Sequence, residues 1–135
     1  MSLNNRNIDI IKHMANYCNE IQETVNRFGK TFEAFESDFV YRNACTMCIL
    51  QVGELAGKLS EEFKLAYPEI PWKNIKGMRN VFAHNYGNMS LLATWETIND
   101  DIPNLKKYCL KIINAFEVLE QQTEEENNDE DDIEI

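Results

Sequence analysis

The chain has 135 residues, and its 23 acidic side chains outnumber 13 Lys and Arg side chains to give a formal net charge of −10. This length fits one domain, and 44% hydrophobic with 27% charged residues is close to the globular average. Five Gly and three Pro are too few for a turn-rich β-sandwich or β-barrel. The bulk charge also argues against nucleic-acid binding, which needs clustered Lys and Arg.

Two long helices are predicted in the first half of the chain. The first carries apolar residues at helical spacing and ends near Gly29: Ile8, Ile11, Ala15, Cys18, Ile21, Val25 and Phe28. The second has Ser37 as its predicted N-cap and apolar positions from Val40 to Leu59. Gly53 and Gly57 lie four residues apart in it, so another helix could approach closely at that point.

Shorter helices and a terminal helix are predicted in the second half. Asn85–Asn88 has the composition of a loop, and no window alternates apolar and polar residues at the period of a strand. The predicted helices begin at Ser60, Pro71, Ser90 and Asp101–Pro103. We therefore expect an all-α fold, an antiparallel helical bundle with two long helices and several shorter ones.

The acidic charge is concentrated at the end of the chain. Residues 124–135 contain eight acids and no Lys or Arg, so residues 1–123, with 13 positive and 15 negative side chains, have a net charge of only −2. A run of this kind has no apolar face to bury. The sequence predicts a helical domain over residues 1–123 and a disordered acidic tail over 124–135. This tail either keeps the protein in solution, or docks on a basic partner or folds over a basic site.

The four cysteines are predicted to be structural. Cys45 and Cys48 have the spacing of half a zinc site, but no second ligand pair accompanies them and they lie within a helical pattern. Neither a metal nor a cofactor is therefore expected. The chain shows no secretory signal pattern and no apolar run near the ~20 residues of a membrane span, which favours a cytoplasmic protein without membrane contact.

The segment from Arg79 to Tyr86 carries the chemically active groups. It combines a permanent cation, the Asn80 amide, an imidazole at His84 that titrates near neutral pH, and a phenol. Two further basic residues, Lys73 and Lys76, precede it, and Lys76 shares a helix face with Arg79. A basic patch suited to RNA phosphates could therefore lie here, despite the bulk charge.

These residue types suit RNA cleavage by a ribose 2′-hydroxyl. His84 can transfer protons, Arg79 can clamp the phosphate, and Asn80 can orient His84 from four residues away. Residues five apart on a straight helix, however, point about 140° away from each other. Arg79 and His84 converge only if the helix ends near His84, which the following loop favours, or if a second protomer completes the site.

A structural interpretation of the same residues stays open. A His near a helix C-terminus interacts favourably with the helix dipole, and an Arg one turn earlier could pair with a surface acid. The other histidine, His13, has polar neighbours and is predicted to be a surface residue.

The Arg79-Asn80-x-x-x-His84-x-Tyr86 segment resembles the Arg-x4-His-x-Tyr motif of the HepT toxins, a branch of the HEPN superfamily. The resemblance covers roughly residues 38–110 and leaves out the first helix and the acidic tail. Its other matching segments are, in order, Gly53-Glu54-Leu55-Ala56, Lys58-Leu59-Ser60, Tyr67 to Trp72, Gly77-Met78-Arg79-Asn80, Trp95 and Ile102-Pro103-x-Leu105.

The resemblance implies a dimeric helical bundle whose two motifs meet in a cleft. It implies a metal-independent ribonuclease toxin with Arg79 and His84 as catalytic residues and Asn80 in support. The implied partner is a minimal nucleotidyltransferase antitoxin that transfers AMP to Tyr86, which would place negative charge beside Arg79 and repel RNA. Two alternatives remain: a non-catalytic binding module for such a nucleotidyltransferase, and a purely structural helical dimer.

Overall fold

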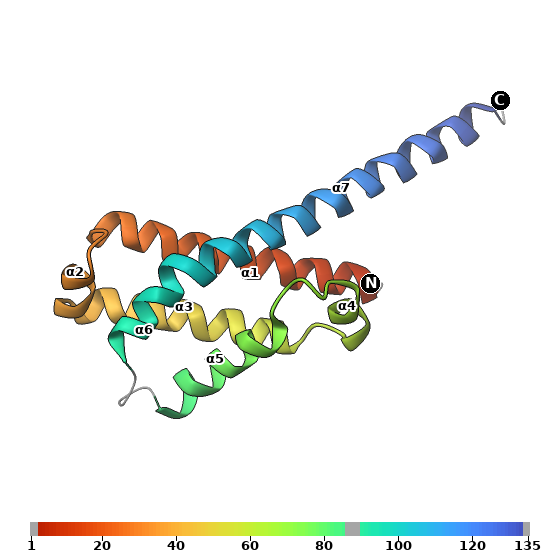
Figure 1. Cartoon of the computed structure of the whole chain (residues 1–135). Helices are drawn as coiled ribbons and strands as arrows, with labels where there is room; N and C mark the ends of the chain where they lie inside the picture. The colour runs from red at the N-terminus through yellow and green to blue at the C-terminus, as the bar shows by residue number, and fades with distance from the viewer. Residues whose placement is uncertain (1–2, 86–89, 134–135) are drawn as a thin grey trace.

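The computed structural model describes the backbone of residues 3–85 and 90–133 and the side chains of residues 5–79 and 90–127. Every described element is helical, and the helices pack as a bundle (Figure 1). The all-α fold predicted from the sequence is therefore confirmed.

Two antiparallel helices, α1 (Leu3–Phe28) and α3 (Phe39–Gly57), form the centre of the bundle, and α7 packs on α1 from the other side (Figure 1). The apolar stripe predicted for α1 lies in the core, and Ile11, Cys18 and Ile21 are fully buried. Gly29 ends α1 with φ 117°, a conformation that glycine adopts at little cost, as predicted for that position.

A short helix, α2 (Phe32–Ser37), connects the two central helices along the chain. The sequence predicted Ser37 as the cap of α3, and this is wrong, because Ser37 is the last residue of α2. Asp38 caps α3 instead, and its Oδ1 accepts hydrogen bonds from the backbone N–H of Val40 at 2.9 Å and Tyr41 at 3.4 Å. Phe32 and Phe35 belong to this short helix, and Phe35 is fully buried.

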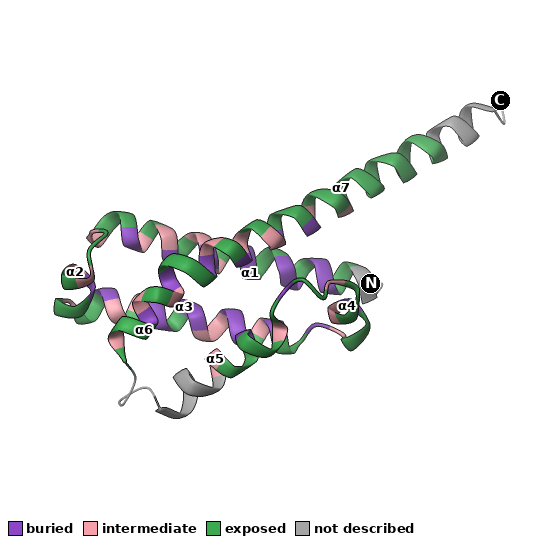
Figure 2. Ribbon diagram, in the orientation of Figure 1, coloured by how far each residue is buried: buried purple, intermediate pink, exposed green. Residues whose placement is uncertain are grey.

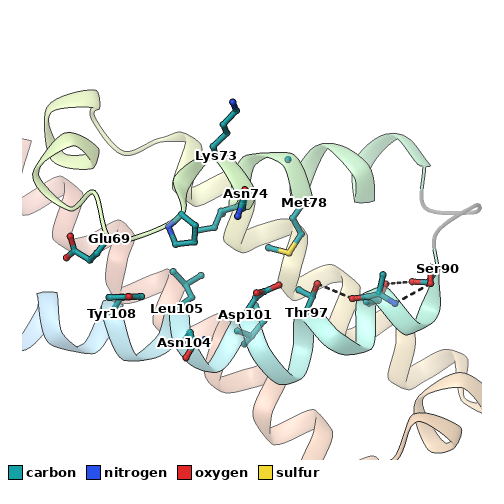
Figure 3. Close-up of a pocket in the computed structure, with 16 residues that line it drawn as sticks. Glu69, Lys73, Asn74, Met78, Ser90, Thr97, Asp101, Asn104, Leu105 and Tyr108 are labelled. Atoms are coloured by element: carbon teal, nitrogen blue, oxygen red, sulfur yellow. Dashed lines mark hydrogen bonds between the residues drawn. The ribbon is translucent and has the colours of Figure 1, made fainter.

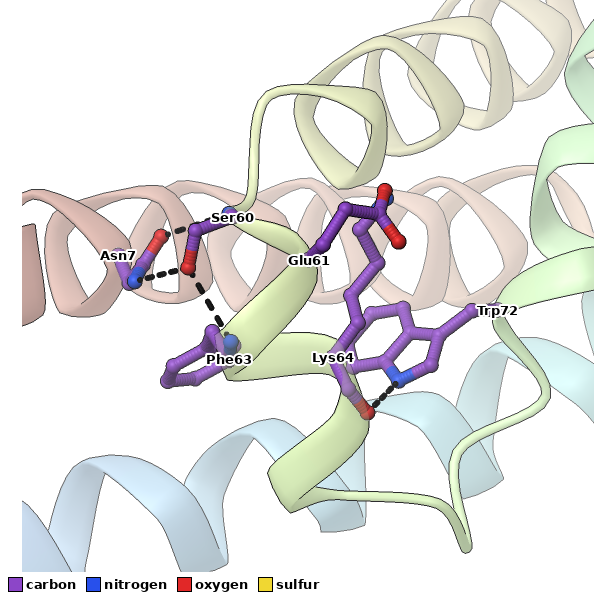
Figure 4. A network of polar contacts seen from close by, with 6 residues as sticks. All are labelled: Asn7, Ser60, Glu61, Phe63, Lys64 and Trp72. Carbon is purple, nitrogen blue, oxygen red and sulfur yellow. Dashed lines mark hydrogen bonds and ion pairs between the residues drawn. The ribbon is translucent and has the colours of Figure 1, made fainter.

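The connection from α3 to α5 is held to α1 by a polar network. Asn7 is buried, its Nδ2 donates to Ser60 Oγ at 3.1 Å, and its Oδ1 accepts from the Ser60 backbone N–H at 3.2 Å (Figure 4). Ser60 also caps α4 (Glu61–Ala66) through the N–H of Phe63, as predicted. The Trp72 indole donates to the backbone carbonyls of Lys64 and Tyr67, each at 3.1 Å. These bonds fix the start of α5 (Trp72–Asn85) against α4.

The last helices form one continuous rod. Ser90 caps α6 (Leu91–Glu96) as predicted, but the helix then continues through a π-helical turn, η2 (Thr97–Asp101), into α7 (Ile102–Ile133). The last helix was predicted to start at Asp101–Pro103, and α7 does begin there, but no break in the helical backbone precedes it. Proline lacks an N–H and its ring crowds the carbonyl four residues earlier, and a wider π turn relieves both effects without ending the helix.

α7 extends beyond the bundle, and its residues 117–127 are exposed (Figure 2). The helix includes residues 124–133 of the acidic segment, where the sequence predicted disorder. Extending an existing helix avoids the nucleation cost, and Glu is a good helix former. The division into a domain and a tail stays a prediction. No helix in the described part of the chain is long and apolar enough to cross a membrane, and the cytoplasmic location also stays a prediction.

The four cysteines are buried free thiols, as expected for core residues. Burial raises the pKa of Cys18, Cys45 and Cys109 from 9.0 to about 12, and that of Cys48 to about 11. Within the described residues, no group of three or more His, Cys, Asp or Glu side chains is placed to hold a metal ion.

Candidate functional site

Arg79 lies on α5 where that helix packs against α3. Its Nε and Nη2 each lie 2.5 Å from Oε1 of Glu54 on α3. The pair is at the surface, with 34% of the Arg79 side chain and 47% of the Glu54 side chain exposed. Arg79 is thus held in a defined direction and remains accessible to solvent.

A glycine allows the two helices to meet at this point. A Cβ atom built on Gly53 would overlap the Arg79 side chain and lie 3.3 Å from its Cα. Only glycine therefore lets the α5 backbone come this close, as predicted from the sequence. Gly57, one turn later, has nothing within 4 Å of the same position, so the close approach involves Gly53 and not Gly57.

Lys73 and Lys76, the predicted RNA contacts, are both exposed on α5. Neither takes part in an ion pair within the described part of the chain, whereas Lys64 pairs with Glu61 at 3.3 Å. Together with the Arg79–Glu54 pair, this reduces the predicted basic patch to two exposed lysines beside a neutralised arginine.

A groove of about 1190 Å³ lies between α5 and the η2–α7 rod. Asn74 and Met78 point from α5 toward Asp101 and Thr97 on the opposite wall, while the Lys73 side chain extends away from α7 (Figure 3). Arg79 does not line this groove. Lys73 thus lies at the edge of the groove with its side chain directed away from α7, and Arg79 lies on the side of α5 that faces α3.

The remaining motif residues fall outside the described side chains. These are Asn80, His84 and Tyr86, together with the predicted loop at 85–88, of which only Asn85 has a described backbone. The backbone of α5 is helical through Asn85, so Arg79 and His84 are five residues apart on one helix, and His84 lies in its last turn. The two routes to convergence, a helix end near His84 or a second protomer, both remain open.

The purely structural interpretation requires Arg79 and His84 to be paired internally and buried. Arg79 is paired with Glu54, but a third of its side chain is exposed, and the His84 side chain lies outside the described residues. His13, the other histidine, is exposed on α1 as predicted.

Glu54 is the site residue that sequence reasoning missed. The sequence pattern places Glu54 in the segment Gly53–Ala56 of the HepT resemblance without predicting a role for it. Glu54 lies 25 residues before Arg79, and only the packing of α3 on α5 brings the two together. An acidic residue next to a glycine inside an apolar helix was the available signal.

Comparison with known proteins decides the family. Residues 14–112 match the family described as "Ribonuclease HepT-like". The chain belongs to the HepT-like ribonuclease family. The HepT-like match begins within α1, which the resemblance seen in the sequence had left out, and it ends before the acidic segment.

Individual HepT-like relatives are about one third identical. A candidate RNase of Caldanaerobacter subterraneus subsp. tengcongensis is 33% identical over 103 residues, which cover 76% of this chain and 90% of the relative. A candidate RNase of Methanocaldococcus jannaschii is 32% identical over 100 residues, covering 73% and 83%. The "Probable ribonuclease HepT" of Thermococcus cleftensis is 32% identical over 89 residues, covering 64% and 81%. No solved structure matches the chain.

Proposed function

We propose that this protein is a metal-independent endoribonuclease of the HepT type. Arg79 binds the scissile phosphate, His84 transfers the proton, Asn80 orients His84, and Lys73 and Lys76 contact the flanking RNA. The observation that carries the proposal is a solvent-accessible Arg79, held in one orientation at the α3–α5 contact of a HepT-like chain. A guanidinium in such a position suits phosphate, because its planar donors match two phosphate oxygens.

We further propose that the active form is a homodimer built on the outer face of α3. Val40, Met47 and Glu54 follow one another at intervals of seven residues and therefore lie on one side of α3. The first two, with Phe39, are large exposed apolar side chains: 48% of Val40, 56% of Met47 and 66% of Phe39 is exposed. An apolar patch of this kind suits contact with another protein surface. A second copy seated there would lie beside the Arg79–Glu54 pair and could supply the second half of the site.

The biological role we propose is that of a toxin neutralised by a minimal nucleotidyltransferase. Transfer of AMP to Tyr86 would add a phosphate and a nucleoside seven residues after Arg79. The added negative charge would compete with RNA for the guanidinium.

RNA cleavage by the purified protein in EDTA tests the first proposal. Wild type should cut RNA, and Arg79→Ala and His84→Ala should each lose about 10²-fold or more in kcat, since one removes the phosphate clamp and the other the proton carrier. His13→Ala is the matched control, because it removes an exposed histidine from α1 and should leave the rate unchanged. Equal cleavage by wild type and His84→Ala would sink the proposal, and a stable nucleotidyltransferase complex without cleavage would favour the binding module.

Intact mass after co-expression with a minimal nucleotidyltransferase tests the neutralisation. One or more added AMP groups are expected in the wild type and none in Tyr86→Phe. Tyr17→Phe, which changes a tyrosine on α1, should be modified like the wild type. Retention of the added mass in Tyr86→Phe would exclude Tyr86 as the acceptor.

A further inference from the structure

The Arg79–Glu54 pair joins two helices rather than two neighbours on one helix. Glu54 belongs to α3 and Arg79 to α5, and both guanidinium contacts are made to the same carboxylate oxygen at 2.5 Å. Contacts from both Nε and Nη2 restrict the rotation of the guanidinium as well as its position.

The backbone beside the pair is equally constrained. Gly53 precedes Glu54, and the absence of a side chain there lets α5 rest directly on α3 at Arg79. One residue of α3 therefore sets the distance to Arg79, and the next sets the direction of its guanidinium. Such a combination of backbone contact and side-chain bond keeps a long, flexible arginine in one arrangement.

The bond to Glu54 also fixes the direction of the other edge of the guanidinium. The Glu54 carboxylate meets the edge formed by Nε and Nη2. An arginine has five N–H donors, and the edge formed by Nη1 and Nη2 is the second that can engage a phosphate in two parallel bonds. The Glu54 carboxylate on the Nε–Nη2 edge therefore fixes the direction in which the Nη1–Nη2 edge points.

We propose that Glu54 is a positioning residue of the ribonuclease site, which orients Arg79 for the phosphate. This inference rests on the proposed function. Glu54 itself does not touch RNA, since its negative charge would repel the phosphate. Its removal therefore acts in two opposite ways: the arginine loses its orientation, which slows the chemical step, and the site loses a negative charge, which helps RNA to bind.

A merely structural ion pair would behave differently. Exposed pairs contribute little to stability, and removing one that has no part in the chemistry should leave kcat unchanged even though the arginine becomes more mobile. The separation of kcat from KM therefore distinguishes positioning from structure.

The test compares Glu54→Ala and Glu54→Gln with wild type in full-length protein. For Glu54→Ala we expect kcat for RNA cleavage to fall about 10-fold to 10²-fold while KM is unchanged or lower, as for a displaced catalytic group. Glu54→Gln keeps an oxygen acceptor without the charge and should lie between the two. Glu61→Ala removes the acid of the Lys64 pair on α4 and is the matched control, with wild-type kcat expected.

A second measurement does not depend on cleavage. The solvent exchange of the Arg79 Nε–H, assigned in NMR spectra by its disappearance in Arg79→Lys, should be slow in wild type and in Glu61→Ala and fast in Glu54→Ala. Unchanged exchange or unchanged kcat in Glu54→Ala overturns the inference, and so does a raised kcat, which would make Glu54 a competitor of the phosphate. Equal cleavage by wild type and Arg79→Ala would instead overturn the proposed function, and the exchange rates would still decide whether Glu54 holds Arg79.

Discussion

At the scale of single residues, two glycines in the same helix have different surroundings. Gly53 and Gly57 lie one turn apart in α3, but only Gly53 faces another helix, where any side chain would collide with Arg79. Gly57 faces open space. The spacing predicted a close approach at both positions, and the structure confirms it at Gly53 alone, because the direction in which α5 crosses α3 is not encoded by the spacing.

This difference predicts opposite effects of the same substitution. Gly53→Ala should lower the free energy of unfolding by about 1–3 kcal/mol through overpacking, and it should impair RNA cleavage because Arg79 moves. Gly57→Ala should be neutral or stabilise by up to about 1 kcal/mol, since alanine favours the helix and meets nothing there. Urea unfolding and cleavage assays on both variants measure this, and equal effects of the two substitutions would contradict it.

At the scale of elements, helix starts depend on one capping atom each. Thr31, Asp38, Ser60 and Ser90 all accept a hydrogen bond from a backbone N–H in the first turn of the helix that follows. Ser60 and Ser90 were predicted correctly because each stands alone before an apolar pattern. Ser37 was predicted wrongly, because the adjacent Asp38 is equally suited to the role and only the geometry of the turn after α2 selects it.

Paired substitutions at these neighbours test the assignment. Asp38→Ala should cost about 1 kcal/mol of stability, because the first turn of α3 loses its acceptor. Ser37→Ala should cost a few tenths of a kcal/mol at most, since the Ser37 hydroxyl only donates to the Ala34 carbonyl at the exposed end of α2. Thermal unfolding of both variants decides this, and a larger loss in Ser37→Ala would reverse the assignment.

At the scale of the whole molecule, charge and burial are distributed unevenly. Eight of the acids lie in residues 124–135, of which residues 124–133 form the end of α7, while residues 1–123 are nearly neutral. The core contains all four cysteines as buried free thiols. Both features have consequences for how the protein responds to solution conditions.

The acidic segment should oppose RNA binding at low ionic strength. Replacing its eight acids by the corresponding amides, or deleting residues 124–135, should strengthen RNA binding several-fold at about 50 mM salt and much less at high salt. The amide variant keeps the length of the helix, so it isolates the charge. Fluorescence anisotropy with labelled RNA provides the measurement, and unchanged binding in both variants would show that the segment plays no part.

The buried thiols predict a loss of stability at alkaline pH. Burial raises the pKa of Cys18, Cys45 and Cys109 to about 12, so these thiols stay neutral in the folded protein while they ionise near pH 9 in the unfolded chain. Their contribution is fully present below pH 9 and is lost as the pH rises from 9 to 12. Unfolding followed between pH 8 and 11 should show this fall.

Cys18→Ala is the variant that isolates the thiol contribution from other groups that titrate at high pH. It should be less stable than wild type at pH 8, but the decrease from pH 8 to 11 should be smaller by roughly 2 kcal/mol. An identical decrease in wild type and Cys18→Ala would contradict the assignment.

The sequence by itself determined the helical class, most helix starts and the identity of the motif residues. These features follow from local periodicity, from single capping side chains and from the residue types in Arg79–Tyr86. Only the tertiary structure decided that Glu54 contacts Arg79 and that α5 packs against Gly53 rather than Gly57. It also decided that α6 continues into α7 through a π turn. Each of these depends on how helices distant in sequence cross one another, and the crossing is set by the packing of the whole core rather than by any local pattern.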